Sequence, residues 1–590
     1  MKRLPFTLIP VLVTACPGGG ESDSSAGSDT SSSSGAQTAD PSATGTLTDA
    51  SSSGPSEGSS TGPGGDSSTG TSTDTSQGFT AGSSEGSSAA SSTGPLENCA
   101  PGQTQACYSG PPGTADVGLC AAGEQTCGPE GEWGECAGEV TPGVEDCGSP
   151  GDEDCDGVDA CAVGYPWSHS FGGVEFVQGR RVAVDATGAV IVSVNSSGKN
   201  TLDFGGGPLP GKGGSDVSLV KYAADGTYLW SHRFAVDDKS YVRGAAVAAG
   251  DDGRIVLTGE FDADIDFGGG TIAAQSGNDG FLAVYGPDGA HEWSEPLRTG
   301  SSIKPTWADI TAAGDVLLTG HFGGWVDLGG AVLTGAGSSD VFVARFHADG
   351  EHAWSLRFGD PKTQTSHGVV EDAAGDIYVG GSFEGLIDPG SGPLASAGDS
   401  DAFLAKFDGQ GGALWGKRWG GAKADRLFTL AIDGDGRLGF GGETLGGIDI
   451  GGGPLGMGVS NYVAVVDGEG AHQWSRPVSA GQTGLQAVSF DGAGALFMTG
   501  GFYGANDFGG GPLESAGIGD IFLVKLDDAG EHVWTRSFGD AAHQAPAGVA
   551  AMSTGAVAIV GEIGGTVDFG DGPHVGPNTP SRGFVAAFGP

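Results

Sequence analysis

One sequence unit is repeated seven times between residues 165 and 590, and this repeat limits the possible folds more than any other feature of the chain. A tryptophan marks each copy and recurs every 59 to 63 residues. A fixed period in this range indicates stacked supersecondary units, as in solenoids, propellers or arrays. The marker residues are Trp167, Trp230, Trp293, Trp354, Trp415, Trp474 and Trp534. An aspartate heading a glycine-rich turn, most often D-F-G-G-G, keeps the same spacing at Asp203, Asp266, Asp327, Asp388, Asp449, Asp507 and Asp568.

Each repeat contains four short β patterns with turn residues between them. In the copy that begins at Trp354, the expected strands are 368–370, 376–383, 402–407 and a fourth that begins at 413–415. In the third of these, Phe403, Ala405 and Phe407 alternate onto one face. Alternating patterns bounded by Asp/Gly turns are typical of strands and hairpins. Because no window of helical periodicity is long enough to form a helix, the sequence predicts an all-β fold.

The two ends of the repeat region predict how the fold closes. The region begins with a fourth strand at 167–171 and finishes with a third strand at 583–588, so the last unit lacks its own W-S strand. The N-terminal strand can fill that place, which would join the first and last units and remove two exposed sheet edges. An open solenoid would need capping repeats instead. We therefore expect a closed seven-bladed β-propeller of four-stranded blades.

These motifs also carry a family resemblance. The W-S strand, the D-x-x-G turns and the D-F-G-G-G loops of residues 165–590 resemble the seven-bladed β-propeller (SBBP-like) repeats of bacterial lipoproteins. The resemblance covers well over half of the chain. It implies a lipoprotein whose main folded part is a propeller.

The first sixteen residues have the form of a lipoprotein signal peptide. A short basic start is followed by an apolar run, and 13–16 read V-T-A-C, which resembles a bacterial lipobox. The apolar run is too short to span a bilayer. We expect acylation of Cys16 and a lipid anchor in the outer membrane, exposed outside the cytoplasm, since Pro17 stands where an inner-membrane retention signal would have aspartate. An ordinary cleaved secretory signal is the alternative.

Residues 17–96 are rich in Ser, Gly and Thr and contain few apolar residues. Such a segment buries too little apolar surface to offset the entropy of folding, so we expect a disordered linker. As a flexible coil it would reach roughly 50 Å.

Residues 97–164 form a small cysteine-rich module, for which we expect four disulfide bridges. Eight cysteines allow 105 pairings, so the sequence assigns none. Zinc is the competing interpretation, but the segment has no C-x-x-C pair and no histidine. The cysteines are Cys99, Cys107, Cys120, Cys127, Cys136, Cys147, Cys155 and Cys161.

Within this module, residues 152–157 read D-E-D-C-D-G, which matches the opening of a calcium loop. The segment resembles the Cys/Asp-rich metal-binding motifs of bacterial surface proteins, which implies Ca²⁺ ligands at Asp152, Asp154, Asp156 and Asp159. A glutamate is expected at the twelfth position of such a loop, but Val163 stands there. A solvated acidic turn beside a disulfide is the alternative.

Charge limits the partners. The chain has 26 Lys plus Arg against 73 Asp plus Glu, a formal charge of −47. Nucleic acid binding needs clustered basic residues, so this balance argues against it. We expect contact with the membrane only through the lipid.

Several residues inside the repeats invite a chemical interpretation. In five copies the loop aspartate is followed thirteen residues later by a second aspartate, at Asp216, Asp279, Asp340, Asp401 and Asp520. Two carboxylates per blade could hold calcium, or each could fix a turn by accepting backbone N–H bonds. The fifth and seventh copies have Asn461 and Arg582 at the second place, which favours the structural interpretation. For the histidines two residues before a tryptophan, at His291, His352, His472 and His532, we also expect structural roles.

Residues that break the repeat are the better guide to function. The clearest are Trp307, Trp325 and Trp419, which could contact a ligand or fill the interior between blades. We expect a binding or scaffolding platform for protein or glycan, because propellers present many loops on a rigid disc. The alternatives are a hydrolase or lyase acting on extracellular glycan, which needs non-repeated paired carboxylates, and a purely structural envelope protein. No catalytic constellation is found, so we expect no enzyme.

Overall fold

The computed structural model describes residues 99–142 and 165–590, apart from residues 112, 113, 116, 130, 173–174, 276–277, 457, 480–481 and 577–580. In the first range, β1 (Thr104–Cys107) and β2 (Gly123–Thr126) pair antiparallel. Disulfides join Cys99 to Cys127 and Cys107 to Cys136, and Cys120 is also disulfide-bonded. The predicted disulfide module is thus confirmed for these five cysteines.

Residues 165–590 form seven antiparallel four-stranded blades, numbered in chain order, as predicted. Their strands follow from the innermost to the outermost. Blade 1 has β4 (Val177–Val184), β5 (Val190–Ser197), β8 (Ser215–Tyr222) and β9 (Tyr228–Phe234); blade 2 has β10 (Val242–Ala249), β11 (Ile255–Phe261), β14 (Asp279–Tyr285) and β15 (His291–Thr299); blade 3 has β16 (Ser302–Ile310), β17 (Val316–Gly323), β20 (Asp340–Phe346) and β21 (His352–Phe358); blade 4 has β22 (Gln364–Glu371), β23 (Ile377–Phe383), β26 (Asp401–Phe407) and β27 (Ala413–Trp419). Blade 5 has β28 (Asp425–Ile432), β29 (Leu438–Thr444), β32 (Ser460–Val466) and β33 (His472–Pro477); blade 6 has β34 (Gln482–Phe490), β35 (Leu496–Tyr503), β38 (Asp520–Leu526) and β39 (His532–Phe538); blade 7 has β40 (Gln544–Ala551), β41 (Val557–Ile563), β44 (Arg582–Phe588) and β3 (Trp167–Phe171).

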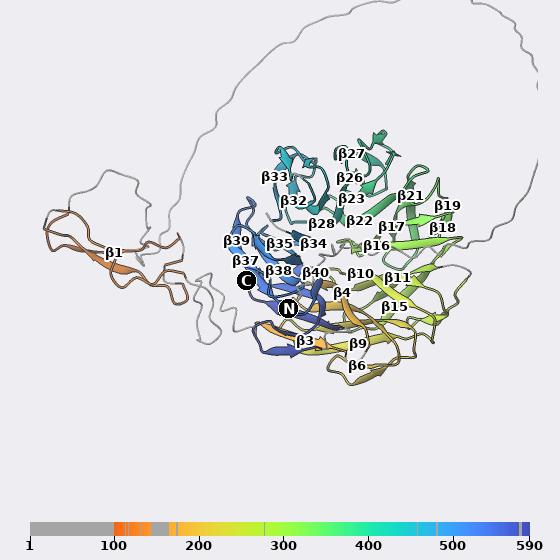
Figure 1. Ribbon diagram of the computed structural model, residues 1–590, viewed down its shortest axis with the longest axis horizontal. Helices are drawn as coiled ribbons and strands as arrows, with labels where there is room; N and C mark the ends of the chain where they lie inside the picture. Colours follow the sequence, from red (N-terminus) through yellow and green to blue (C-terminus); the bar gives the residue numbers. More distant parts are fainter. Residues whose placement is uncertain are drawn as a thin grey trace, which may run out of the picture. The chain divides into compact units, whose positions relative to one another are not determined.

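The blades stand around one ring. The innermost strands, from β4 and β10 through to β40, each contact the next, and β40 returns to β4. Figure 1 shows these strands nearest the middle and the fourth strands at the outside. The predicted closure is confirmed, because β3 pairs antiparallel with β44 from Trp167↔Ala587 to Phe171↔Gly583. The ring therefore has no unpaired edge between its first and last blades.

The hydrophobic core is divided into seven clusters, one between each pair of neighbouring blades. The second and third strands of a blade are covered on both faces, so all seven residues of β26 are buried. Phe403, Ala405 and Phe407 share one face, as predicted, and pack between blades 3 and 4, while Ala402 and Leu404 pack between blades 4 and 5. A strand sandwiched between two sheets buries both sets of alternating side chains.

Two local features recur in every blade and position the residues discussed below. Each innermost strand carries a β-bulge at the same place, where the register shifts. The aspartate loop between the second and third strands, predicted as a loop, is a short hairpin. The hairpins are β6 (Thr201–Asp203) with β7 (Pro208–Pro210), β12 (Ile265–Asp266) with β13 (Thr271–Ile272), β18 (Trp325–Asp327) with β19 (Leu333–Thr334), β24 (Leu386–Ile387) with β25 (Leu394–Ala395), β30 (Ile448–Asp449) with β31 (Pro454–Leu455), β36 (Ala505–Asp507) with β37 (Pro512–Glu514), and β42 (Thr566–Asp568) with β43 (Pro573–Val575).

Candidate functional site

The aspartate that heads each glycine-rich turn is bonded to its own hairpin. Asp203 Oδ1 accepts the backbone N–H of Gly205 at 2.9 Å and of Gly207 at 3.1 Å. These two glycines have φ of +115° and +103°, a conformation that favours glycine. Both backbone bonds recur in five other hairpins, at Asp266, Asp388, Asp449, Asp507 and Asp568. Asp327 accepts the equivalent of the Gly205 bond, from the N–H of Gly329. The turn-fixing interpretation of these aspartates is confirmed.

The second aspartate of the repeat begins the third strand and pairs with an arginine of the fourth. Asp216 accepts from Nε and Nη2 of Arg233 at 3.2 and 2.9 Å, and the two side chains are 0% and 2% exposed. A buried carboxylate of this kind needs a bonded cation to offset its desolvation. The same ion pair forms in the next three blades, as Asp279–Arg298, Asp340–Arg357 and Asp401–Arg418.

The last three blades lack this ion pair. In blade 5, Asn461 donates to the carbonyl of Gly442 at 3.1 Å, and in blade 7, Arg582 donates to that of Val575 at 3.0 Å. In blade 6, Asp520 accepts the N–H of Ala516 at 2.6 Å, but its buried Oδ1 has no hydrogen-bond partner within the described residues. Burial raises the pKa of Asp520, and the Ala516 N–H lowers it. In blades 1, 3 and 4 the arginine stands three residues after the tryptophan, a spacing that our reading of the sequence missed; blade 6 keeps the aspartate but has Ser537 there.

The repeated tryptophan joins neighbouring blades. The indole Nε1 of Trp354 in blade 3 donates to the carbonyl of Gly409, in the outer turn of blade 4, at 3.1 Å. The equivalent bonds to the next blade are Trp167 to Ala224 at 2.7 Å, Trp230 to Pro287 at 3.1 Å, Trp293 to Ala348 at 3.0 Å and Trp474 to Asp528 at 3.1 Å. Trp415 Nε1 is buried without such a partner among the described residues. The sequence period therefore reflects a contact that recurs at five of the interfaces between blades.

The repeated histidines also act in the fold. His472 Nε2 is 2.9 Å from Ser475 Oγ, and His532 Nε2 is 2.8 Å from Thr535 Oγ1. Each imidazole also lies against the glycine tip of the neighbouring hairpin: an added Cβ at Gly269 would come within 2.4 Å of the His291 ring. The structure supports the expected structural roles.

The three tryptophans outside the repeat have different surroundings. Trp419 is 9% exposed and stacks on Phe440 with ring centroids 5.3 Å apart, so it fills the interior between blades 4 and 5. Trp325 is 40% exposed on β18. Trp307 lies partly buried on the innermost strand β16, with the guanidinium carbon of Arg181 5.9 Å from its ring centroid. Trp307 also packs against the core cluster between blades 3 and 4, so interior filling is confirmed for Trp419 and in part for Trp307.

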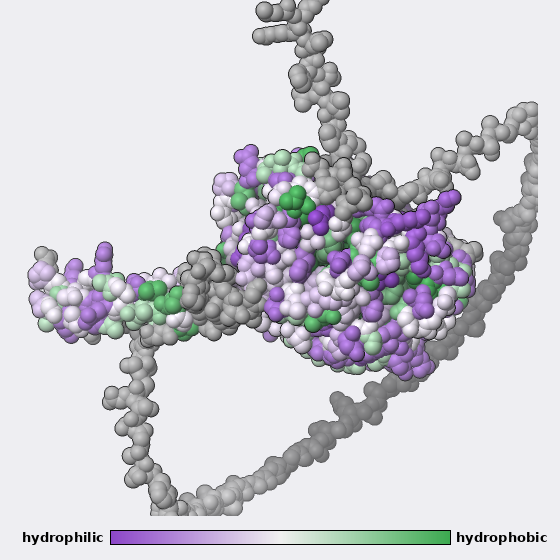
Figure 2. All heavy atoms as spheres, turned by 90° about the horizontal axis from the view of Figure 1, so that it is seen from below, coloured by the Kyte–Doolittle hydropathy of each residue, from purple (hydrophilic) through white to green (hydrophobic). Residues whose placement is uncertain are grey.

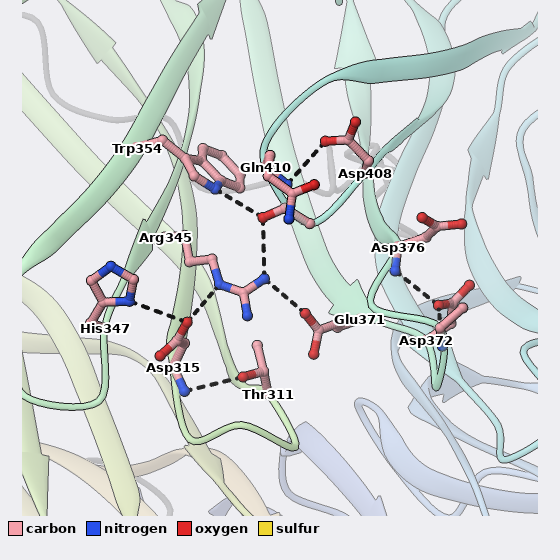
Figure 3. Close-up of polar contacts among 12 residues, drawn as sticks. Thr311, Asp315, Arg345, His347, Trp354, Glu371, Asp372, Asp376, Asp408 and Gln410 are labelled. Carbon is pink, nitrogen blue, oxygen red and sulfur yellow. Dashed lines mark hydrogen bonds and ion pairs between the residues drawn. The ribbon is translucent and has the colours of Figure 1, made fainter.

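A hydrogen-bonded network with a surface pocket of about 460 Å³ lies where blades 3 and 4 meet (Figure 3). Arg345 bonds to Asp315 at 2.8 Å and to Glu371 at 3.0 Å, and its Nη1 donates to Gly409 O, which also accepts from Trp354. Burial raises the pKa of Glu371, and Arg345 opposes that rise. A lysine stands at the position of Arg345 in the third strand of three other blades, and it also forms an ion pair with an aspartate. These pairs are Lys221–Asp185, Lys406–Asp376 and Lys525–Asp491. This network therefore belongs to the repeat and joins blades.

A further group of residues that break the repeat lies near the axis. Five basic residues lie on innermost strands, at or within two positions of the bulge, and we call them the axial basic cluster: Arg180, Arg181, Arg243, Lys304 and Arg426. They are close enough to interact electrostatically. Lys304, Arg243 and Arg180 all act on the carboxyl of Glu260, and Arg181 and Arg426 both act on His367. The cluster thus brings together blades 1, 2, 3 and 5.

Two histidines beside this cluster are neutral at ordinary pH. Burial, with His367 and Lys304 nearby, lowers the pKa of His321 to about 3. Burial, with Arg181 and Arg426 nearby, lowers the pKa of His367 to about 4. A further imidazolium among fixed cations would be costly, so both rings stay uncharged.

The turn end of an innermost strand carries one unusual acid. Asp309 on β16 occupies a position where blades 1 and 2 have Ala183 and Ala248. Burial raises the pKa of Asp309 to about 7; the N–H groups of Ile310 and Glu371 oppose the rise. The axis therefore differs in charge between its two ends.

Several predicted site residues lie outside the described residues. These are Cys16, Asp152, Asp154, Asp156, Asp159, Cys147, Cys155 and Cys161. Within the described residues, no group of three or more His, Cys, Asp or Glu is placed to hold a metal ion. No helix in the same residues is long and apolar enough to cross a membrane.

Comparison with known proteins adds little to this picture. No protein-family model matches the chain. Regulatory protein FlaEY of Caulobacter vibrioides is 26% identical over 261 residues, which are 43% of this chain and 21% of that protein, so the chain spans about a fifth of this relative's length. Among solved structures, U3-55K has 10% identity and a TM-score of 0.36, covering 71% of this chain and 98% of that one. A gluconolactonase from Xanthomonas campestris has 14% identity and a TM-score of 0.28, covering 57% and 88%.

Proposed function

We propose that this protein is a lipid-anchored binding platform that works outside the cytoplasm. In this proposal an acylated Cys16 holds the chain in the outer membrane, and residues 17–96 give the folded part its reach. The seven-bladed ring then presents a binding surface to a protein or glycan. The lipobox-like V-T-A-C and the disulfides support the compartment, since disulfides persist in oxidising environments.

One observation carries the binding role. The rim of the ring is made mainly from repeated contacts, while basic residues that break the repeat lie near the axis, on innermost strands of four blades. A fold that needed only to be stable would use the repeated residue in every blade. Proteins retain costly local departures mainly where function requires them.

The surface of the ring supports a platform rather than a membrane-embedded body. Figure 2 shows hydrophilic side chains over much of the visible propeller surface, with apolar ones in small separate areas. The exposed large apolar residues are spread over several blades, as at Leu229, Leu414 and Val533 on fourth strands. A surface of this kind suits a soluble body held near a membrane by its lipid.

The lipid anchor is tested by labelling cells that produce the full chain with radioactive palmitate. We expect label on the wild-type protein and none on a Cys16→Ser variant. Label on neither would overturn the anchor, and label on both would place it elsewhere.

The binding role is tested with the full-length Cys16→Ser protein immobilised and washed with separated envelope polysaccharides and envelope proteins, in calcium and in EDTA. We expect one defined component to be retained in both buffers, because the axial basic cluster needs no metal. Retention only in calcium would transfer the binding role to the cysteine-rich module. If neither buffer retains anything, a structural envelope protein replaces the platform.

A further inference from the structure

The axial basic cluster is unexpected in so acidic a chain. Only 26 residues are Lys or Arg, against 73 Asp or Glu, and yet five of the basic ones converge near the axis. Arg180 and Arg181 stand side by side, and burial together with the charge of Arg180 lowers the pKa of Arg181 to about 10. Like charges held together repel each other, so their grouping costs stability unless an anion joins them.

The fold does not require positive charge at these positions. The position two residues before the bulge carries Arg243, Lys304 and Arg426 in blades 2, 3 and 5. The equivalent residues in the other blades are Gln178, Thr365, Gly484 and Ala545. Four blades form the same strand and bulge with an uncharged side chain or with glycine at this position. The three cations therefore serve something other than the fold.

The carboxylates nearby do not neutralise the cluster. Glu260 pairs in register with Arg243, and Glu443 pairs with Arg426 and forms a 3.3 Å ion pair with it. Glu562 stands at the matching position of blade 7 and accepts a bond from Ser581 at 2.6 Å. Five cations against these three carboxylates leave an excess of positive charge. Burial raises the pKa of Glu260, and Lys304, Arg243 and Arg180 oppose the rise.

The cluster has an accessible edge and an inner part that combines a cation with aromatic rings. Arg243, Lys304 and Arg426 are exposed. Further in, Arg181 donates from Nη1 to the carbonyl of Ala547 at 2.8 Å and lies near the Trp307 ring, while its Nε is buried with no hydrogen-bond partner within the described residues. Such an Nε is a donor that an incoming anion can satisfy.

The side chains favour a carboxylate on a small cyclic ligand. A guanidinium presents parallel N–H donors that match a carboxylate or a phosphate. The ring of Trp307, with the His367 and Phe428 rings whose centroids are 6.1 Å apart, adds aromatic surface beside the charges. A few convergent polar groups beside aromatic surface are typical of sites for small polar ligands with an apolar face, such as a pyranose.

The net charge of −47 limits how much negative charge that ligand can carry. A long polyanion would place its other charges against the acidic remainder of the protein. A single carboxylate in an otherwise neutral molecule avoids this repulsion. We propose that the axial basic cluster binds a uronate residue of a largely neutral glycan, with the carboxylate on Arg243, Lys304 and Arg426. This rests on the binding role proposed above and specifies its ligand.

The test is calorimetric titration of the full-length Cys16→Ser protein with a neutral xylo-oligosaccharide that carries one glucuronate. The same oligosaccharide without the acid, free D-glucuronate and inorganic phosphate are the comparison probes. We expect binding of the acidic oligosaccharide, weaker binding of free glucuronate, and an affinity at least tenfold lower for the neutral one. Added salt should weaken the binding, since the exposed charges are screened.

Two variants of the same protein make the test specific. The triple variant Arg243→Gln, Lys304→Gln and Arg426→Gln should lose affinity at least tenfold, with a melting temperature no lower than that of the unsubstituted protein, because it relieves repulsion among the cations. Lys212→Gln, an exposed lysine of blade 1 away from the innermost strands, should bind as the unsubstituted protein does. Equal affinity in the triple variant, or phosphate binding as tight as that of the acidic oligosaccharide, would overturn the uronate assignment. If no acidic probe binds while the immobilised protein still retains an envelope component, this proposal fails and the platform stands.

Discussion

The rim and the axis of this ring are built on opposite principles. At the rim the same residue makes the same contact in blade after blade: Trp354 donates to Gly409, as four other repeat tryptophans donate to their neighbours. At the axis, equivalent positions hold arginine, lysine, threonine, glycine or alanine. The comparison teaches that the repeated residues encode the fold, and that the basic residues that depart from the repeat at the axis serve another purpose, which we propose is binding. Rim substitutions should therefore change stability, and axis substitutions should change binding.

The largest effect is expected from Arg233→Met in blade 1. This change leaves Asp216 buried without its cation and also removes the bonds from Arg233 to the carbonyls of Asn200 and Leu209. Breaking a buried ion pair costs about 3–5 kcal/mol. Urea unfolding should show a lower midpoint, with binding of the acidic oligosaccharide unchanged in the folded protein. The double variant Arg233→Met, Asp216→Asn should recover part of the loss; equal losses in the two would contradict the role of the pair.

A smaller and opposite effect is expected from Asp309→Asn at the axis. The folded carboxyl of Asp309 keeps its proton up to a pKa of about 7, whereas an unfolded one loses it near pH 4. The folded state therefore binds the extra proton, and the free energy of unfolding falls as pH rises from about 4 to about 7. The variant lacks this group, so it should be more stable than wild type by ~1–3 kcal/mol at pH 8 and equal to it at pH 4. Urea midpoints at the two pH values measure this, and a difference that does not change with pH would refute it.

A matched pair of tryptophans separates the hydrogen bond from the ring. Trp354→Phe removes the donor to Gly409, whereas Trp415→Phe removes an Nε1 that has no partner in the described part of the chain. A hydrogen bond contributes about 1 kcal/mol net to the free energy of unfolding. Trp354→Phe should therefore lower that free energy by about 1 kcal/mol more than Trp415→Phe does, and should lower the melting temperature more. Equal shifts would mean that ring packing alone explains the repeated tryptophan.

The smallest effect is expected from Asp507→Ala at a hairpin tip of blade 6. Its two bonds to Gly509 and Gly511, at 2.8 and 3.1 Å, are exposed, so water can replace the carboxylate. The melting temperature should fall less than it does for Trp354→Phe. We expect that Asp507 binds no calcium. Thermal scans of the wild type and the variant, in calcium and in EDTA, should therefore show the same difference in melting temperature in both buffers. A difference that depends on calcium would restore the metal interpretation of the loop.

The sequence predicted the strands of this fold well because their pattern is local. Residues 167–171 were expected to be the strand that completes the last blade, and β3 (Trp167–Phe171) occupies that place. The alternation of Phe403, Ala405 and Phe407 onto one face was predicted correctly, whereas burial of the opposite face, with Ala402 and Leu404, depends on the neighbouring blade. The short hairpins were missed because two or three paired residues leave no periodicity to detect.

The candidate site was less predictable. Trp307 was singled out from the sequence as a departure from the repeat, and it does lie near the axis. The basic residues beside it were not singled out, because Arg180 and Arg426 are 246 positions apart and nothing local links them. The Asp–Arg pair could have been found only in part: Arg233, Arg357 and Arg418 stand three residues after their tryptophans, but the second copy has Pro296 there and pairs Asp279 with Arg298 instead.

The sequence by itself determined the number of blades, the four-stranded unit, the turn chemistry of the aspartates and the closure of the ring. All of these follow from patterns that span at most one repeat, or from comparing one repeat with the next. Only the tertiary structure decided which residues meet at the axis and which aspartates are buried with a cation. Those contacts join blades that are far apart in the chain, and a closed ring brings them together only when all seven blades are in place.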